Sequence, residues 1–473
     1  MTSTAGTSPY LLGAFAPLRE EATEHRLVVT GRVPDELDGL FTQIGPSPVR
    51  PPRHRSAERY PWLLADGLVC GVRLRGGRGL WFRNRWIRSR RVARALGGRR
   101  APGPRHFPVD TVNTNVVSHS GLVLALVESG CLPVQLSSTL DSVGYTDLGG
   151  QLPRGFSAHP KLDPETGDLH VLAYSPLRTW AEYLVLAPSG RVRTVRRVPL
   201  HGRPMLHDIA LTPNYVLFFD LPVRFDGVKG LRGGFPYRWR DEHQSRVGVL
   251  PRAGGAMRWI AIPPCFVYHV VGAEEISPDR IVVRAIRYAR LFDEHTEDPF
   301  GRPGTLWEWD LDLTADSAPA RQLDGRPSEM PRIDPRRQGR AHRFYYAVTA
   351  TTSQAVRTHA PDGLVKYDLR RQAGEVRRLR PGDATTEAVF VPRADSAAED
   401  AGWILHFRYD GDRDASDLVV FDAEDFTGPP LATVRLPVRV PVGAHSTWIP
   451  AADLASTPGT GPGHEAPGHE ASA

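Results

Sequence analysis

Polar residues recur along this chain at a nearly constant step. The segments that contain them are short and apolar, and none of them lies in a histidine-rich cluster. The residues in this setting are His159, His207, His269, Glu329, Glu387 and His445. From His207 onward the steps are 62, 60, 58 and 58 residues. One polar residue at a fixed interval predicts a circular repeat in which each unit supplies one inward-pointing side chain. Imidazoles and carboxylates that converge on one axis would form a metal centre supported by carboxylates.

Most of the remaining sequence has the pattern of short β-strands. Residues 121–128, 280–288 and 402–410 are typical: each is rich in β-branched and aromatic residues and is bounded by Gly, Pro, Asp or Asn. Helical periodicity is confined to residues 20–26 and 91–96. The 45 glycines and 43 prolines are spread along the chain, as tight turns between many strands require. The sequence therefore predicts an all-β protein.

An all-β chain of this length folds either as several sandwiches in series or as one propeller. Sandwiches need linkers, and no linker composition occurs between about residue 30 and residue 452. A step near 60 residues suits a four-stranded blade with long loops, and seven such units fill this span. We therefore expect an N-terminal arm at residues 1–30, a seven-bladed propeller at 31–452, and a tail at 453–473. The tail repeats a Pro-Gly-His-Glu-Ala sequence, which predicts disorder.

Composition limits the cellular setting and the partners. The three cysteines are too few and too scattered for a disulfide framework, no secretory signal is present, and no apolar run is long enough to cross a membrane, so we expect a cytoplasmic protein. The net charge of +6 is densest in the arginine-rich stretch 83–105. This stretch is either a solvated face or a peripheral contact with anionic lipid headgroups. No recognition motif accompanies it, which argues against nucleic acid.

The histidine segments carry a family resemblance. They are FSAHPKLD at 156–163, MLHDIALT at 205–212, CFVYH at 265–269 and GAHSTWIP at 443–450. Together with GPSP at 45–48, RNR at 83–85, NTNV at 113–116 and EMPRID at 329–334, they follow one another as do the signature blocks of the carotenoid cleavage oxygenase family. The chain resembles that family from about residue 30 to residue 450, and many blocks in the right order make the resemblance specific.

This resemblance implies a fold, a cofactor and a reaction. The family members are seven-bladed propellers in which four histidines bind one Fe(II) on the axis, and three glutamates hydrogen-bond to the ligands. The matching ligands here are His159, His207, His269 and His445, and the matching glutamates are Glu128, Glu329 and Glu387. The implied reaction is cleavage of a conjugated C=C bond of a lipophilic substrate by O2 to give two carbonyl products. It needs no catalytic side chain beyond the metal ligands.

The chemistry of the donor set agrees with that assignment. Four neutral imidazoles leave both charges of Fe(II) uncompensated, so nearby carboxylates stabilise the site and select one tautomer of each ring. An octahedral ion with four protein ligands keeps two positions open for O2 or water. Structural zinc is disfavoured, because it prefers closed tetrahedral sites that are often built with thiolates.

One departure from the family pattern bears on the substrate. Stilbene-cleaving members typically carry a lysine before the first glutamate and a tyrosine upstream, which bind the phenol; the matching positions here are Val127 and, less securely aligned, Arg99. We therefore expect a carotenoid or apocarotenoid substrate. Stilbenoid cleavage, non-oxidative isomerohydrolysis on the same fold, and a non-catalytic propeller are the alternatives.

Aromatic residues beside the ligands are candidates for lining an apolar substrate tunnel, with plain blade packing as the alternative for each. They are Phe156, Phe266, Tyr268 and Trp448. The sequence leaves the scissile bond, the substrate length and the oligomeric state open.

Overall fold

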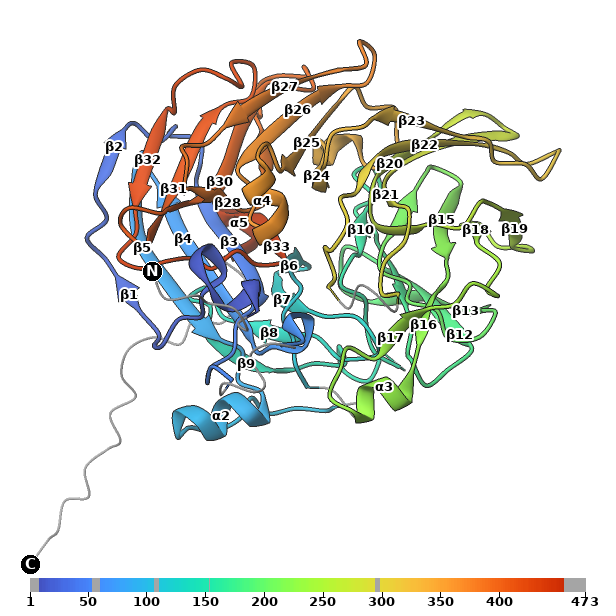
Figure 1. The fold of residues 1–473 in the computed structure, drawn as a ribbon, viewed down its shortest axis with the longest axis horizontal. Helices are drawn as coiled ribbons and strands as arrows, with labels where there is room; N and C mark the ends of the chain where they lie inside the picture. The colour runs from blue at the N-terminus through green and yellow to red at the C-terminus, as the bar shows by residue number, and fades with distance from the viewer. Residues whose placement is uncertain (1–7, 53–59, 106–109, 153, 294–297, 455–473) are drawn as a thin grey trace, which may run out of the picture.

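The computed structural model describes residues 8–52, 60–105, 110–152, 154–293 and 298–454. Seven antiparallel sheets surround one axis as the blades of a propeller (Figure 1). A separate two-stranded ribbon, β16 (Val223–Phe225) with β17 (Tyr237–Trp239), lies outside them. The predicted all-β, seven-bladed fold is confirmed.

Each of blades 2 to 6 has four strands, and the first strand in the chain is the innermost one. Blade 2 contains β6 (Asn115–His119), β7 (Leu122–Leu126), β8 (Val134–Leu136) and β9 (Ser142–Tyr145). Blade 3 contains β10 (Lys161–Leu162), β11 (Leu169–Ala173), β12 (Trp180–Leu186) and β13 (Val192–Pro199). Blade 4 contains β14 (Ile209–Leu211), β15 (Tyr215–Asp220), β18 (Arg246–Pro251) and β19 (Arg258–Ala261).

Blades 5 and 6 follow the same pattern. Blade 5 contains β20 (Phe266–Ser277), β21 (Arg280–Tyr288), β22 (Thr305–Asp312) and β23 (Ala320–Asp324). Blade 6 contains β24 (Glu329–Arg332), β25 (Phe344–Thr349), β26 (Gly363–Asp368) and β27 (Ala373–Arg378).

Blades 7 and 1 close the ring, because each contains strands from both ends of the chain. Blade 7 contains β28 (Ala384–Thr385), β29 (Val389–Pro392), β30 (Gly402–Asp410), β31 (Ala415–Asp422), β32 (Ala432–Arg435) and β2 (Val29–Gly31). Blade 1 contains β33 (His445–Pro450), β3 (Gly39–Pro46), β4 (Gly67–Arg75), β5 (Arg78–Trp86) and β1 (Thr23–Glu24). The N-terminal β2 covers the outer edge of blade 7, while the C-terminal β33 is the inner strand of blade 1.

The hydrophobic core lies between neighbouring blades rather than in one centre. One cluster joins blades 1 and 7 through residues such as Phe41, Phe82 and Phe407, and another joins blades 6 and 7 around Tyr346 and Phe390. Strands in the middle of a blade are buried on both faces, as in β11, whereas the outer strand β13 alternates between exposed and half-buried residues. Continuous apolar runs and alternating runs in the sequence therefore mark inner and outer strands.

Helices are short and few in the described chain. They are α2 (Arg90–Leu96), α3 (Gly227–Leu231), α4 (Ser353–Thr358) and α5 (Ala451–Leu454), with 3-10 turns at Pro9–Leu11, Gly13–Phe15, Trp62–Leu64 and Pro335–Arg337. The helix predicted at 91–96 is confirmed as α2. The helix predicted at 20–26 is wrong. Thr23 and Glu24 form a short strand that pairs with Arg83 and Phe82 and so supplies backbone hydrogen bonds to the edge strand β5 of blade 1.

The ends of the chain are more closely built into the blades than the predicted arm suggests. Residues 1–7 and the predicted tail from residue 455 onward lie outside the described residues. Within the predicted arm, β1 and β2 pair with blade strands, and Tyr10 and Phe15 pack against Trp62 in a small apolar cluster. No described helix combines the length and the apolar character needed to cross a membrane.

The close approach of another backbone segment explains why the GPSP block has a glycine at position 45. It lies on β3 next to Ile44, whose partner in the sheet is His445, and a Cβ atom at Gly45 would lie 2.3 Å from the Cα of Gly443. We expect Gly45→Ala to force the 443–445 segment away from β3, to lower the free energy of unfolding by roughly 1–3 kcal/mol and to displace His445. Thermal unfolding and metal content measure the two effects. Gly98→Ala, where a Cβ meets nothing within 4 Å, is the control, and equal behaviour of the two variants would contradict this account.

Candidate metal centre

Every blade places one polar residue at its inner edge, near the axis. His159 and His207 lie in the turns that lead into β10 and β14, His269 lies within β20, and His445 begins β33. Glu329 begins β24, Glu387 lies between β28 and β29, and Thr114 directly precedes β6. The regular step in the sequence is therefore the repeat length of the blades. Because inner strands converge on the axis, residues far apart in the chain meet there.

The four histidines form one compact, buried cluster. Their nearest ring nitrogens all lie within 4.8 Å of one another. The Nε2 atom of His207 lies 3.1 Å from that of His159 and 3.3 Å from that of His269, which in turn lies 3.1 Å from the Nε2 of His445. Two nitrogens that bind one ion at right angles are about 3.0 Å apart, since each metal–nitrogen bond is about 2.1 Å. Four convergent imidazoles in this arrangement fit a single transition-metal ion.

Carboxylates occupy the other ring nitrogen of three of these histidines. The Nδ1 of His207 lies 2.8 Å from Glu128, that of His269 lies 2.5 Å from Glu329, and that of His445 lies 3.1 Å from Glu387. A carboxylate accepts the Nδ1 proton, which leaves the Nε2 lone pair free for a metal. The predicted glutamates are thus all in hydrogen-bonding contact with a histidine of the cluster.

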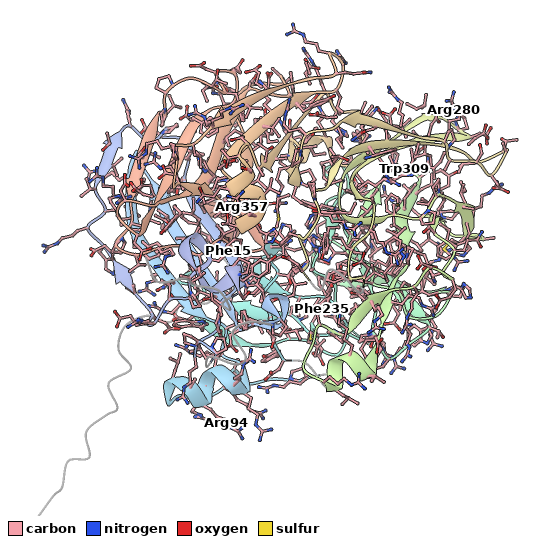
Figure 2. All side chains as sticks on the ribbon, viewed as in Figure 1. Phe15, Arg94, Phe235, Arg280, Trp309 and Arg357 are labelled. Carbon is pink, nitrogen blue, oxygen red and sulfur yellow. The ribbon has the colours of Figure 1, made fainter. Side chains whose placement is uncertain are left out.

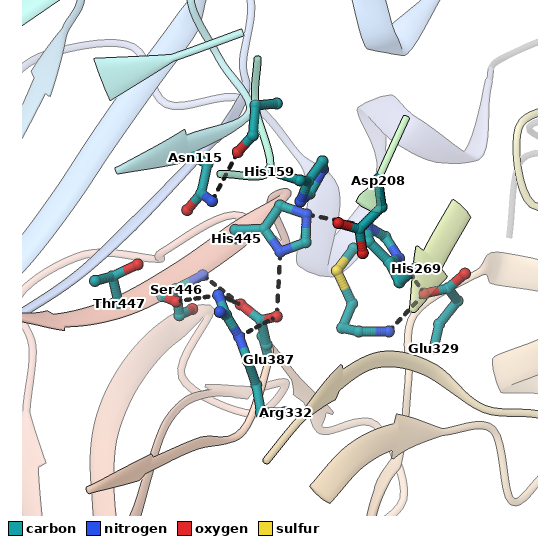
Figure 3. A network of polar contacts seen from close by, with 12 residues as sticks. Asn115, His159, Asp208, His269, Glu329, Arg332, Glu387, His445, Ser446 and Thr447 are labelled. Atoms are coloured by element: carbon teal, nitrogen blue, oxygen red, sulfur yellow. Dashed lines mark hydrogen bonds and ion pairs between the residues drawn. The ribbon is translucent and has the colours of Figure 1, made fainter. Parts of the chain in front are cut away.

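Glu387 is the most strongly held of the three carboxylates (Figure 3). Arg332 donates to it from Nε at 2.8 Å and from Nη2 at 3.0 Å, and the backbone N–H of Ser446 donates at 2.6 Å. Burial alone would raise the pKa of Glu387, but the charges of Arg332 and His445 and their hydrogen bonds lower it to about 2. Glu387 therefore stays ionised and ties blades 6, 7 and 1 together at the axis.

Glu329 has a different set of donors. The hydroxyl of Tyr288 donates to it at 2.7 Å and the backbone N–H of Met330 at 2.5 Å. Burial opposes ionisation of Glu329, yet the charge and hydrogen bond of His269 leave its pKa lowered. Met330 has a φ of 54°, unusual for a residue other than glycine, and this turn brings its N–H toward the carboxylate.

His159 differs from the other three histidines because no carboxylate contacts its ring in the described chain. Burial, followed by the neighbouring His207, His445 and His269, holds the pKa of His159 well below its usual value. Burial likewise lowers the pKa of His445 to about 4 despite Glu387. These two rings are neutral at physiological pH, as metal ligation requires.

Blade 2 is where the regular spacing of polar residues fails, and the positions of Glu128 and Thr114 show why. Glu128 follows β7, the second strand of blade 2, so it is not an axial position of that blade. The axial position belongs to Thr114, whose carbonyl accepts the backbone N–H of His445 at 3.2 Å. The sequence pattern missed Thr114 because a threonine is not distinctive among many others, and it missed Arg332 because spacing carries no information on ion pairs.

Asp208 lies next to His207 but has a structural role. Its carboxylate pairs with Lys161 at 2.8 Å and accepts the backbone N–H of Val270 at 2.9 Å. It therefore connects blades 3, 4 and 5 close to the axis and is not part of the histidine cluster.

An apolar cavity of about 340 Å³, the central cavity, opens onto the cluster. His207, His269 and His445 form its floor together with Glu128, and Val127, Phe235 and Leu231 are among its apolar wall residues. No lysine or arginine of the described chain lines it. Figure 2 shows Phe235 on the side of the molecule that carries α3.

Among the predicted tunnel residues, the structure places Tyr268 on the wall of the central cavity. Its ring packs edge-on against His207 at 5.0 Å, and its buried hydroxyl has no hydrogen-bond partner among the described residues. Phe156 and Phe266 are buried in the packing between blades, and Trp448 packs with the cluster of blades 1 and 7. These three have the packing role that was the stated alternative.

A second, smaller cavity of about 110 Å³, the side cavity, adjoins the central one. Glu329 and Glu387 line it, so it also reaches the carboxylates that hold the cluster. Residues that line both cavities are Trp62, Phe300, Met330 and Ala444. A long ligand across the cluster would therefore have space on both sides.

A metal-affinity measurement tests whether the carboxylates support a metal site. Glu128→Gln keeps the shape of the side chain but removes the charge that favours the Nε2 ligand form of His207. We expect metal affinity to fall by roughly 10- to 100-fold with little change in thermal stability of the metal-free protein. Competition with a chelator, followed by metal quantification, gives the affinity. Glu275→Gln, at a half-buried carboxylate six residues along β20 from His269 that bonds to Asn214, is the control; equal affinities for both variants would refute the role of Glu128.

Comparisons with known proteins agree with this geometry. The family model described as retinal pigment epithelial membrane protein matches residues 15–450. A carotenoid cleavage oxygenase of Mycobacterium tuberculosis is 36% identical, covering 94% of this chain and 98% of its own length. An isoeugenol monooxygenase of Pseudomonas nitroreducens is 30% identical, covering 93% of this chain and 98% of its own.

Solved structures show the same fold. The lignostilbene dioxygenase of Pseudomonas brassicacearum superposes with a TM-score of 0.84 at 26% identity, covering 94% of this chain and 98% of that one. The cobalt-substituted apocarotenoid oxygenase of Synechocystis has a TM-score of 0.81 at 26% identity, covering 94% and 99%. Four histidines on the axis of a seven-bladed propeller, a family match over nearly the whole chain and these relatives lead to one conclusion: the chain belongs to the carotenoid cleavage oxygenase family.

Proposed function

We propose that this protein is an Fe(II)-dependent dioxygenase that cleaves a conjugated C=C bond of a carotenoid or apocarotenoid to give two carbonyl products. The observation that carries the proposal is the cluster of four histidines, carboxylate-supported at three rings, on the floor of an apolar cavity. Relatives named as carotenoid cleavage oxygenases and an apocarotenoid-15,15'-oxygenase of Synechocystis support the reaction class.

We assign His159, His207, His269 and His445 as the ligands of one Fe(II) per chain. The donor set fits this ion, because imidazole suits iron and four protein ligands leave two of six positions open. When bound, the iron supplies the binding and activation of O2. Glu128, Glu329 and Glu387 hold the Nδ1 protons of three ligands and so orient those rings toward the ion.

The rest of the site binds substrate and excludes water. The walls of the central cavity are largely apolar, so a polyene gains free energy by leaving water, about 25 cal/mol for each Å² buried. The proposed cleavage does not require a side chain that donates or accepts a proton. Val127 lines the cavity where a phenol-binding lysine would stand, and the absence of any lysine from the described wall favours a polyene over a stilbenoid.

Fe(II) loading followed by product analysis tests this function. We expect about one iron per chain after anaerobic loading and, in air with 18O2, cleavage of an apocarotenal or β-carotene into carbonyl products that carry 18O. His207→Ala should lose iron and activity, whereas the exposed His201→Ala should keep both. If resveratrol were the only compound cleaved, the substrate class would be stilbenoids rather than carotenoids. Turnover without 18O would indicate isomerohydrolysis, and iron-free, inactive protein would refute the proposal.

We also propose a peripheral membrane contact at the mouth of the central cavity. Leu177 and Leu231 line that cavity and are 59% and 92% exposed, and Val228 on α3 is 59% exposed beside them. Exposed apolar side chains around a cavity for a lipophilic ligand fit a surface that enters the lipid interface. Figure 1 shows α3 at the same edge of the molecule as α2.

The arginine-rich stretch contributes less charge to such a contact than its sequence suggests. Arg83 and Arg85 pair with Asp141, Arg88 pairs with Glu21, and Arg105 pairs with Asp110. The exposed arginines that remain without a carboxylate partner among the described residues lie on α2 and directly after it: Arg90, Arg94, Arg99 and Arg100. These four are the ones that we expect to contact anionic headgroups.

Vesicle binding tests the membrane contact. Leu231→Ser should weaken co-sedimentation with phosphatidylcholine–phosphatidylserine vesicles by roughly tenfold or more, because burying one leucine side chain is worth about 1.5–3 kcal/mol. Ile276→Ser is the matched control, since Ile276 is also exposed but lies at the end of β20 remote from His269. Equal binding by the two variants, or no binding by the unmodified protein, would overturn the proposed contact.

A further inference from the structure

A second cluster of polar side chains lies behind the wall of the side cavity. Its members are Tyr10 from the N-terminal segment, Asp298 from the segment that follows β21, and His359 directly after α4. The Nε2 of His359 lies 2.6 Å from one carboxylate oxygen of Asp298, and the hydroxyl of Tyr10 donates to the other oxygen. Both oxygens of this half-buried carboxylate therefore have a donor.

Only His359 among these three residues reaches the side cavity. His359 lines the cavity, whereas Asp298 and Tyr10 stand behind it. In Figure 2, Arg357 on α4 and Phe15 lie near each other on this side of the propeller. The surface of this cavity is mostly apolar, with Phe15, Val348 and Val356 among its members. Its lining also contains the polar residues Ser328, Thr349 and Arg302, and Arg302 pairs with Asp293.

The imidazole of His359 is held in one orientation. Its ring stacks on that of Tyr10, with centroids 5.6 Å apart, and Tyr10 in turn stacks on Trp62 at 5.0 Å. His359 ends α4 in the left-handed region with a φ of 56°. Ring stacking, the bond to Asp298 and this backbone conformation together restrict rotation of the side chain.

The bond to Asp298 determines what the other ring nitrogen can do. Burial would raise the pKa of Asp298, but the hydrogen bond and charge of His359, with the Tyr10 hydroxyl, leave it lowered. An ionised Asp298 makes the Nε2 of His359 the donor to it, which leaves Nδ1 for another hydrogen-bond partner. Nδ1 has no partner among the described residues.

The position of the side cavity indicates what could approach this nitrogen. A substrate that is cleaved at the histidine cluster must extend to both sides of it. The central cavity can take the longer arm and the side cavity, about a third of its volume, the shorter one. The two spaces meet at Trp62, Phe300, Met330 and Ala444.

We propose that His359, positioned by Asp298 and Tyr10, binds a hydroxyl group at the end of the shorter arm of the substrate. This inference rests on the proposed function for the identity of the ligand, an apolar conjugated chain, and adds the polar group that it carries. A hydroxyl suits Nδ1 because it can either donate or accept a hydrogen bond. On a largely apolar surface this bond discriminates against a ligand that lacks the hydroxyl.

Ligand binding under anaerobic conditions tests the proposal separately from turnover. The iron-loaded protein is titrated with two apocarotenals that differ only in a ring hydroxyl, and quenching of tryptophan fluorescence reports binding. The hydroxylated compound should bind roughly 3- to 10-fold more tightly, the range expected of one neutral hydrogen bond. His359→Phe should abolish this difference and leave affinity for the plain compound unchanged.

Two further variants separate recognition from a structural effect. His359→Asn also removes the imidazole, and asparagine tolerates a positive φ, so it covers the case in which the phenylalanine variant folds poorly. Arg357→Ala, an exposed change on the same helix, should retain the preference and the affinity. All variants should keep a full complement of iron, because His359 contacts none of the four clustered histidines.

The outcomes are distinct from those of the function test. Equal affinity of the unmodified protein for both compounds, or an equal loss for both on His359→Phe, would overturn the hydroxyl site while leaving cleavage intact. A hydroxyl preference that is lost on substitution supports the site even when 18O labelling shows that no oxidative cleavage takes place.

Discussion

The hydrogen bonds between buried carboxylates and imidazole Nδ1 atoms are the interaction on which the centre of this protein depends. Each bond leaves the Nε2 of its histidine as the free donor, and three of the four histidines, all but His159, have such a bond among the described residues. Burying a carboxylate is costly unless it is fully bonded, and here the compensation is local. Glu387 receives Arg332 and a backbone N–H, while Glu329 receives Tyr288 and the N–H of Met330.

A propeller suits such a centre because its geometry is shared among many strands. The four histidines come from four blades, and their spacing is maintained by β-sheet pairing within each blade and by apolar packing between blades. Strands from both ends of the chain complete blades 1 and 7, so the ring cannot open without breaking β-sheet pairs. The strand that completes blade 1 begins with His445, so closure of the ring and placement of a ligand are the same event.

Substrate specificity depends on other parts of the structure than the inner strands that hold the histidines. Segments outside the blades supply part of the cavity walls: α3, the turn that contains Trp62, the stretch around Phe300, and Phe15. Such segments can vary without disturbing the inner strands. This separation explains how relatives named for carotenoids, for isoeugenol and for lignostilbene share one fold. In this chain the polar groups of the walls include His359 and Arg302 in the side cavity and the hydroxyl of Tyr268, which has no hydrogen-bond partner among the described residues.

The sequence by itself determined the β-class, the blade length and the set of four histidines with three glutamates, because these depend on local pattern, on repeat spacing and on recognisable blocks. Other features came only from the tertiary structure. Arg332 pairs with Glu387 over a separation of 55 residues, Thr114 fills the axial position of blade 2, and Tyr10 meets Asp298 across 288 residues. Contacts of this kind leave no periodic signal, since each depends on how separate blades and loops pack in space. For the same reason the sequence misassigned residues 20–26, whose strand exists only because the edge of blade 1 is there to pair with it.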